Sequence, residues 1–171
     1  MTKLTDHLNR FSHSDEAQEV YTPPNAMAAL VPFLDKDLCY YDPTSNTSTN
    51  IVDGLLTLGY NCTRSNGGDF FALPYVEEGC ALVLNPPYNN KDNFLRKCYE
   101  LGKPFAMLLP VAAFQGQTRG KMFMEYGVSV LVYNKRLDFT GGGAPNFGNA
   151  WFMGNNFGGP SGQLHFTDYG V

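Results

Sequence analysis

The sequence lacks the features that mark several specialised classes of protein. Its four cysteines include no CxxC pair, so neither a zinc site nor a dithiol redox motif is indicated. No apolar run approaches the ~20 residues that a membrane-spanning helix needs. The segment Met1–Glu19 is polar and does not resemble a secretory signal. We therefore expect a cytoplasmic protein with buried, reduced thiols, no metal ion and no contact with a membrane.

Internal repeats are absent, and charge is sparse. Charged residues make up 16% and hydrophobic residues 43% of the 171 positions, which is typical of one globular domain with a real core. The net charge of −4 does not favour tight, nonspecific binding of nucleic acid, because such binding depends on neutralising phosphates. Two local groups of basic residues remain as candidate patches, and the first fits a solvated helix face equally well: Lys91, Arg96, Lys97 and Lys103, and then Arg119, Lys121, Lys135 and Arg136.

The main positive feature is a buried strand that stops abruptly. Ala81–Leu84 is apolar, and Asn85-Pro86-Pro87-Tyr88 follows at once. Two consecutive prolines cannot continue a central strand, because neither has an N–H for the ladder. Asn85 is therefore expected just past the carboxyl end of a strand, where open α/β sheets bind their ligands. Tyr88 is expected beside it, on a backbone that the two prolines restrict.

The residue types at this corner suit a planar amino group. The side-chain oxygen of Asn85 and the carbonyls of Asn85 and Pro86 are uncharged acceptors, and Tyr88 offers a ring face for stacking. Such acceptors can hold an NH₂ group and draw its lone pair out of conjugation, so that the nitrogen becomes nucleophilic. The alternative is an ordinary Pro-Pro turn after a strand.

Asn85-Pro86-Pro87-Tyr88 resembles motif IV, the (D/N/S)PP(Y/F) signature of S-adenosylmethionine-dependent amino-methyltransferases, above all the DNA adenine-N6 enzymes. Upstream, Tyr21-Thr22-Pro23 precedes a helical pattern and resembles motif X, which approaches the methionine end of the cofactor in that family. The same segment also fits a plain helix start with Thr22 as the cap. Together the two motifs are similar to small phage-type DNA adenine methyltransferases. The resemblance implies S-adenosylmethionine as cofactor and these residues as catalytic: Asn85, Pro86, Pro87 and Tyr88.

Further cofactor contacts are implied at the ends of two other expected strands. Asp42-Pro43 resembles the start of motif I, but the following loop has Ser, Thr and Asn where the family has glycine, the residue that permits close approach. Asn66 stands where the family has an acid for the ribose hydroxyls. Asp69-Phe70 resembles part of motif III, although Phe70 equally fits a core position. The implied cofactor residues are Tyr21, Thr22, Pro23, Asp42, Thr44, Asn66, Asp69, Phe70 and Asn85.

The alternation of strands and helices predicts an α/β, doubly wound and mostly parallel sheet. The resemblance implies the seven-stranded, Rossmann-like class I methyltransferase fold with a terminal β-hairpin. We expect an N-terminal arm at 1–20, a methyltransferase-like domain at 21–154 and a Gly/Asn-rich tail without a clear element at 155–171. The expected strands are 38–41, 59–66, 81–84, 104–110, 128–133 and 150–153, and the expected helices are 26–34, 51–58, 89–101 and 118–126.

The resemblance implies methyl transfer to an exocyclic amino group, with adenine N6 of DNA as the first expectation and nucleic acid as the partner. The chain has no insert large enough for a target-recognition domain, only short loops such as 89–93, 115–120 and 140–149. Two alternatives stay open. One is an amino-methyltransferase that acts on glutamine in proteins or on RNA, and the other is a non-catalytic binding protein that has lost affinity for the cofactor. We expect a monomer or a weak dimer.

Overall fold

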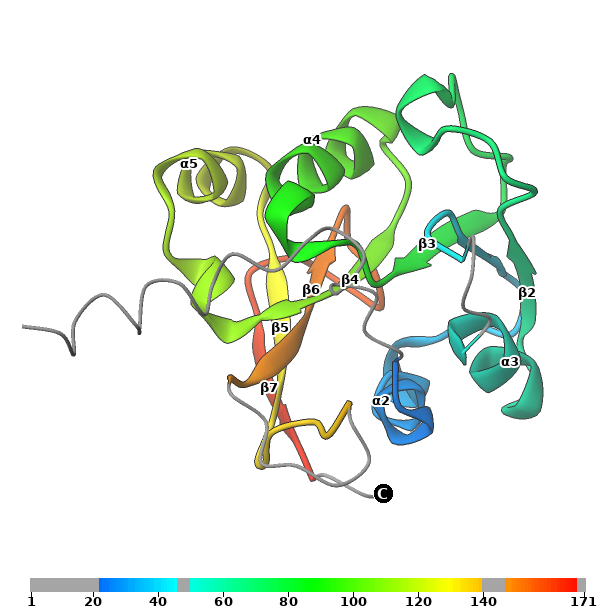
Figure 1. The fold of residues 1–171 in the computed structure, drawn as a ribbon, viewed down its shortest axis with the longest axis horizontal. Helices are drawn as coiled ribbons and strands as arrows, with labels where there is room; N and C mark the ends of the chain where they lie inside the picture. The colour runs from blue at the N-terminus through cyan, green and yellow to red at the C-terminus, as the bar shows by residue number, and fades with distance from the viewer. Residues whose placement is uncertain (1–21, 46–49, 140–146, 169–171) are drawn as a thin grey trace, which may run out of the picture.

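The computed structural model describes residues 22–45, 50–139 and 147–168. In this part of the chain a seven-stranded sheet has the order β2-β1-β3-β4-β6-β5-β7 (Figure 1). Strands β2, β1, β3 and β4 run parallel, β6 lies antiparallel between β4 and β5, and β7 is parallel to β5. The predicted mostly parallel α/β sheet is confirmed. Its strands are β1 (Cys39–Asp42), β2 (Asn61–Arg64), β3 (Cys80–Leu84), β4 (Phe105–Pro110), β5 (Ser129–Tyr133), β6 (Asn149–Gly154) and β7 (Leu164–Thr167).

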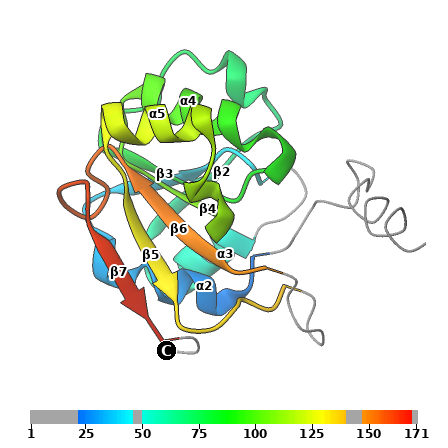
Figure 2. The same cartoon turned by 90° about the vertical axis from the view of Figure 1, so that its left-hand side faces the viewer.

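Helices cover both faces of the sheet, α2 and α3 on one side and α4 and α5 on the other (Figures 1 and 2). Helix α4 shows why the sequence folds this way: it buries Phe94, Leu95 and Cys98 at helical spacing and ends at Gly102, whose φ of 66° is left-handed. The helices are α2 (Pro24–Ala28), α3 (Asn50–Thr57), α4 (Lys91–Leu101) and α5 (Gln117–Tyr126), with short 3₁₀ turns η3 (Val31–Phe33), η4 (Phe70–Ala72), η5 (Tyr88–Asn90) and η6 (Val111–Phe114).

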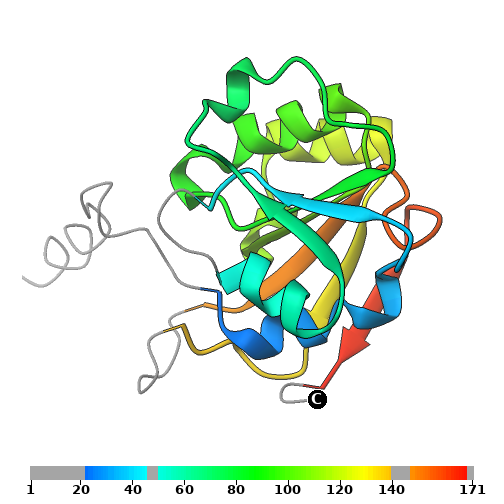
Figure 3. The ribbon, with the colours of Figure 1, turned by 90° about the vertical axis from the view of Figure 1, so that its right-hand side faces the viewer.

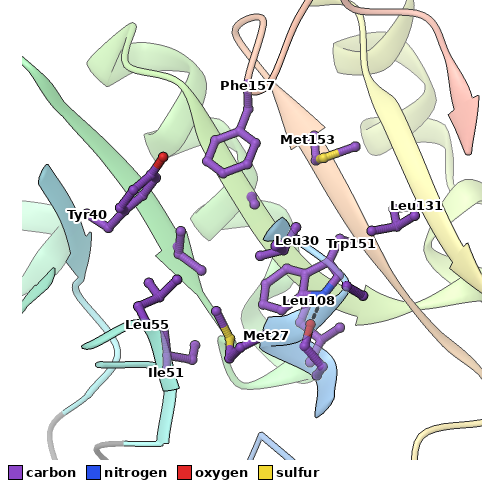
Figure 4. Packing of buried hydrophobic residues seen from close by; sticks show 14 of the residues in the cluster. Met27, Leu30, Tyr40, Ile51, Leu55, Leu108, Leu131, Trp151, Met153 and Phe157 are labelled. Carbon is purple, nitrogen blue, oxygen red and sulfur yellow. Dashed lines mark hydrogen bonds between the residues drawn. The ribbon is translucent and has the colours of Figure 1, made fainter. Parts of the chain in front are cut away.

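The sheet separates two hydrophobic clusters. The cluster beneath α2 and α3 centres on Trp151 of β6, which is fully buried (Figure 4). Its indole N–H donates to the Ala26 carbonyl at 3.0 Å and to the Tyr133 hydroxyl at 2.6 Å, and Tyr133 donates to the same carbonyl at 2.9 Å. Because their polar atoms are paired, these two large rings can be buried without an orphaned donor, and they tie α2 to β5 and β6.

The cluster on the other face lies beneath α4 and α5 and is rich in aromatic rings. Phe105 of β4 packs across the register partner Gly154 of β6. A Cβ at Gly154 would collide with the Phe105 ring, so this glycine is the residue that lets the ring lie over β6. Asp42 and Ser45, at the carboxyl end of β1, are among the few polar side chains that the described residues bury.

Two expectations about regular structure were wrong. The helix expected to continue to Leu34 ends at Ala28 and gives way to η3, and Pro23 is the residue before its first turn, without a cap from the Thr22 side chain. The expected featureless tail contains β7, which pairs with the outer edge of β5. The expected antiparallel pairing of 128–133 with 150–153 is confirmed as the β5–β6 pair. The expected N-terminal arm lies outside the described residues.

Candidate functional site

The candidate site lies where three neighbouring parallel strands end. Asp42 is the last residue of β1, Asn66 comes two residues after β2, and Asn85 follows β3 directly. Because β2 and β3 both pair with β1 in parallel register, these three polar residues lie along the same edge of the sheet. Figure 3 views the molecule from the β2 side of this edge. This placement agrees with the expectation from the three strand-to-polar transitions.

Asp42 organises the turn after β1 from a buried position, with 2% of its surface exposed. Its Oδ1 accepts hydrogen bonds from the Thr44 N–H at 2.9 Å and the Thr44 hydroxyl at 2.6 Å. Its carbonyl accepts from the Ser45 hydroxyl at 3.0 Å and the Ser65 N–H at 3.0 Å. Burial raises the pKa of Asp42 to about 6, and the hydrogen bonds from Thr44 partly oppose that rise. The carboxyl group expected to contact a cofactor therefore also acts as the cap of this turn.

Asn85 is held from two directions. Its Nδ2 donates to the Thr22 hydroxyl at 3.1 Å, and its backbone N–H donates to the Thr44 hydroxyl at 3.3 Å. Thr22 is itself buried, and its carbonyl accepts from Asn50 Nδ2 at 3.1 Å. Since the nitrogen and oxygen of a carboxamide point in different directions, donation through Nδ2 turns Oδ1 away from Thr22. The segment before α2, the corner after β1 and the corner after β3 thus form one hydrogen-bonded unit.

Proline rings stiffen the corner that carries Asn85. Pro86 is buried and Pro87 is exposed, and Pro87 has φ −55° and ψ 127° where the chain enters η5. Both φ angles are restricted by the rings, so the path from Asn85 to Tyr88 depends little on side-chain hydrogen bonds. The corner ends with the Tyr88 carbonyl, which accepts from Lys91 Nζ at 2.7 Å.

Tyr88 is fixed by a residue that sequence reasoning did not identify. Its phenol oxygen accepts from Asn149 Nδ2 at 2.7 Å, and its ring meets Phe147 edge-on with centroids 5.9 Å apart. Burial raises the pKa of Tyr88 above its ordinary value, so the phenol is neutral at pH 7. Asn149 begins β6, and the one signal in the sequence was an amide placed directly before the apolar strand 150–153.

Two of the remaining expected cofactor residues, Asp69 and Phe70, have structural partners. Asp69 precedes η4, and its Oδ1 accepts from the Phe71 N–H at 2.9 Å. Phe70 is 7% exposed and stacks on Phe94 with centroids 5.4 Å apart, which is the core position weighed as its alternative. Asn66 is exposed, and Tyr21 lies outside the described residues. The cofactor roles of these residues remain predictions.

The described part of the chain contains neither a metal-binding cluster nor a helix suited to a membrane. No group of three or more His, Cys, Asp or Glu side chains there is arranged to hold a metal ion. All four cysteines are free thiols. None of the helices described is both long and apolar enough to cross a membrane.

Comparison with known proteins gives a match at the level of fold. No protein-family model matches the chain, and no curated protein matches its sequence. A protein from Listeria monocytogenes assigned to the class I S-adenosylmethionine-dependent methyltransferases matches with a TM-score of 0.60 and 12% identity, over 96% of this chain and 70% of its own. A protein from Agrobacterium tumefaciens assigned as an O-methyltransferase gives a TM-score of 0.48 and 11% identity, over 86% of both chains. The match to the Listeria monocytogenes protein shows that the chain has a Rossmann-like α/β fold of the kind found in class I methyltransferases.

Proposed function

We propose that the protein transfers a methyl group from S-adenosylmethionine to an exocyclic amino nitrogen, with adenine N6 in DNA as the first candidate substrate. The observation that carries this proposal is the anchoring of Asn85 past the end of β3, by Thr22 at its side chain and Thr44 at its backbone. A fixed carboxamide, a proline carbonyl and an aromatic ring then stand together at the edge where α/β sheets bind ligands.

These residues position the target amine, and none of them acts as a charged base. The Asn85 Oδ1 and the Pro86 carbonyl accept the two N–H bonds of the target amine, which withdraws its lone pair from the ring and directs it outward. Tyr88 supports the plane of the substrate by stacking. When bound, S-adenosylmethionine would supply a methyl group made electrophilic by its sulfonium, S-adenosylhomocysteine would be the leaving group, and the methylated nitrogen would release one proton to solvent. A base in duplex DNA has to leave the stack to reach such a corner, at a cost of a few kcal/mol.

The side chains at this edge fit such a cofactor in part. Asn66 is exposed two residues after β2 and offers a side-chain amide to ribose hydroxyls. Asp42 lies at the end of β1, but its Oδ1 already accepts two hydrogen bonds from Thr44. A carboxylate that is buried and internally bonded has less capacity for a ligand, so we expect the affinity for the cofactor to be weak.

Isothermal titration calorimetry with S-adenosylmethionine and S-adenosylhomocysteine tests the cofactor. We expect dissociation constants between the micromolar and the millimolar range. A submicromolar constant would show that the turn after β1 replaces the missing glycines without loss. No heat of binding at millimolar ligand would refute an enzyme of this class and favour a non-catalytic binding protein.

Transfer of a labelled methyl group to DNA, RNA and protein extracts, assayed in parallel, tests the substrate. We expect label on DNA, at adenine. Glutamine in proteins or an RNA base is the second candidate, because the net charge of −4 disfavours tight contact with duplex phosphates. Label on protein or RNA alone would move the substrate to that candidate and leave the role of Asn85 intact.

A further inference from the structure

Asn149 occupies a position where an apolar residue would be expected. It is 2% exposed, it is the first residue of β6, and all the other residues of that strand are buried and apolar or glycine. Its Nδ2 donates to the Tyr88 phenol at 2.7 Å. Its Oδ1 is buried and has no hydrogen-bond partner within the described residues. A buried acceptor left without a donor normally lowers the stability of the folded protein.

The backbone that carries Asn149 is rigid. Asn149 is in register with Pro110 at the end of β4, and the Gly148 carbonyl just before it accepts from the Val111 N–H at 2.8 Å. A carboxamide mounted on a strand that is paired with β4 at this position can therefore hold the phenol of Tyr88 at a fixed point. The edge-on contact of the Tyr88 ring with Phe147 adds a second restraint on the ring.

Stability alone does not account for this pair. A Leu at 149 facing a Phe at 88 would fill nearly the same space without an orphaned oxygen, and replacing both partners of a buried hydrogen bond by apolar groups is often neutral or stabilising. The Oδ1 of Asn149, unpaired within the described residues, thus costs stability, and such a cost is typical of residues that serve a functional site.

We propose that Asn149 is a positioning residue, which holds the Tyr88 phenol in place so that the ring is positioned for a flat substrate to stack on it. This inference rests on the proposed function, because it assigns Tyr88 to the substrate. It differs from that proposal in naming the residue that fixes the position of the Tyr88 side chain. Asn149 itself takes no part in the transfer of the methyl group.

Five proteins test it: wild type, Asn149→Leu, Tyr88→Phe, the double variant with both changes, and Asn149→Asp. The first measurement is the free energy of unfolding. The second is the fluorescence quenching of 2-aminopurine within a single-stranded oligodeoxyadenylate, a probe of stacking that needs no cofactor. The third is kcat and KM for the substrate found by labelled methyl transfer.

We expect stability and stacking to change in opposite directions. The double variant should be at least as stable as wild type, yet bind the 2-aminopurine probe on the order of tenfold more weakly, the effect of one hydrogen bond of about 1.4 kcal/mol. Its KM should rise more than its kcat falls. Asn149→Asp should restore stacking toward wild type, because the Tyr88 hydroxyl can donate to a carboxyl oxygen at the same place.

Wild-type stacking in the double variant would overturn the proposal, and so would a large loss of stability that explains the weaker stacking. Absence of quenching by the wild type would also overturn it, since Tyr88 would then offer no stacking surface. These results are distinct from failure of the proposed function, which would appear as no binding of S-adenosylmethionine and no labelled product while the stacking probe still binds.

Discussion

The two corners that build the site, after β1 and after β3, are stiffened by different means. After β1, side chains hold the turn: Asp42 accepts from Thr44 and, through its carbonyl, from Ser45. After β3, covalent rings hold it, because Pro86 and Pro87 restrict their own φ angles. The first corner depends on protonation and on individual hydroxyls, whereas the path of the second from Pro86 to Tyr88 is restricted by the proline rings themselves. They meet at the Thr44 hydroxyl, which accepts from the Asn85 N–H.

The largest effect, on turnover, is expected from Asn85, which begins the corner after β3. Asn85→Ala should lower kcat by on the order of 10²-fold or more, because it removes an acceptor assigned to the target amine. The affinity for S-adenosylmethionine should stay within a few-fold of wild type. Labelled methyl transfer and calorimetry measure the two quantities, and Asn61→Ala, an exposed change on β2, is the matched control. Wild-type turnover in Asn85→Ala would show that the corner after β3 is only a structural turn.

The second-largest effect is expected from the protonation of Asp42, which should change stability through the corner after β1 and not through the corner after β3. The pKa of Asp42 is raised to about 6 in the folded protein from 3.8, so folding favours the neutral acid. Its stabilising contribution is complete below about pH 4 and is lost as the pH rises through about 6. Between these limits the free energy of unfolding should fall by up to about 3 kcal/mol in wild type relative to Asp42→Asn. Chemical denaturation across this pH range measures it, and parallel curves for the two proteins would contradict a raised pKa.

Substitutions at Thr44 test whether its hydroxyl links the two corners. Thr44→Val should lower the free energy of unfolding by about 2 kcal/mol, because it removes the hydroxyl bonded to both Asp42 and Asn85. It should also raise the pKa of Asp42 further, since the bonds from Thr44 lower that pKa. Thr44→Ser keeps the hydroxyl and serves as the control in the same denaturation series. Equal stability of the Val and Ser variants would show that the hydroxyl does not link the corners.

The smallest effect is expected from a single proline. Pro87→Ala should destabilise the protein by about 0.4–1 kcal/mol, mainly through the greater freedom of its unfolded chain. Pro87 is exposed and its neighbour Pro86 still restricts the corner. The pH dependence of stability should be unchanged, because no titrating group is touched. Thermal unfolding at two pH values is sufficient, and a loss above about 2 kcal/mol would mean that the corner has little other support.

Local chemistry made the mostly parallel character of the sheet and the placement of Asn85 accessible from the sequence. A run of apolar residues that stops at Asn-Pro-Pro leaves few structural options, and the glycines after α3 and α4 marked the ends of those helices. The same local signals placed Asp42 and Asn66 at the ends of neighbouring strands. Each of these features depends on a few consecutive residues.

Features that depend on contacts between distant segments were not accessible. Asn149 meets Tyr88 across 61 positions, and Thr22 meets Asn85 across 63, so neither pairing leaves a pattern in a local window. Leu164–Thr167 is four residues long and lies in a glycine-rich segment, and its strand conformation arises from pairing with β5. Phe70 fitted a cofactor contact and a core position equally from the sequence, and its stacking on Phe94, 24 positions away, could not be read from a local window.

The position of β6 sets an order of events in folding. It is the sixth strand along the chain, yet it lies in the sheet between β4 and β5. While a ribosome is still making the chain, β4 and β5 therefore have unpaired edges that face each other across a missing strand, and such edges invite pairing with other molecules. The sole tryptophan of the sequence, Trp151, arrives with that strand and bonds to α2 and β5 once buried. Its fluorescence thus marks the moment when the two halves of the sheet join.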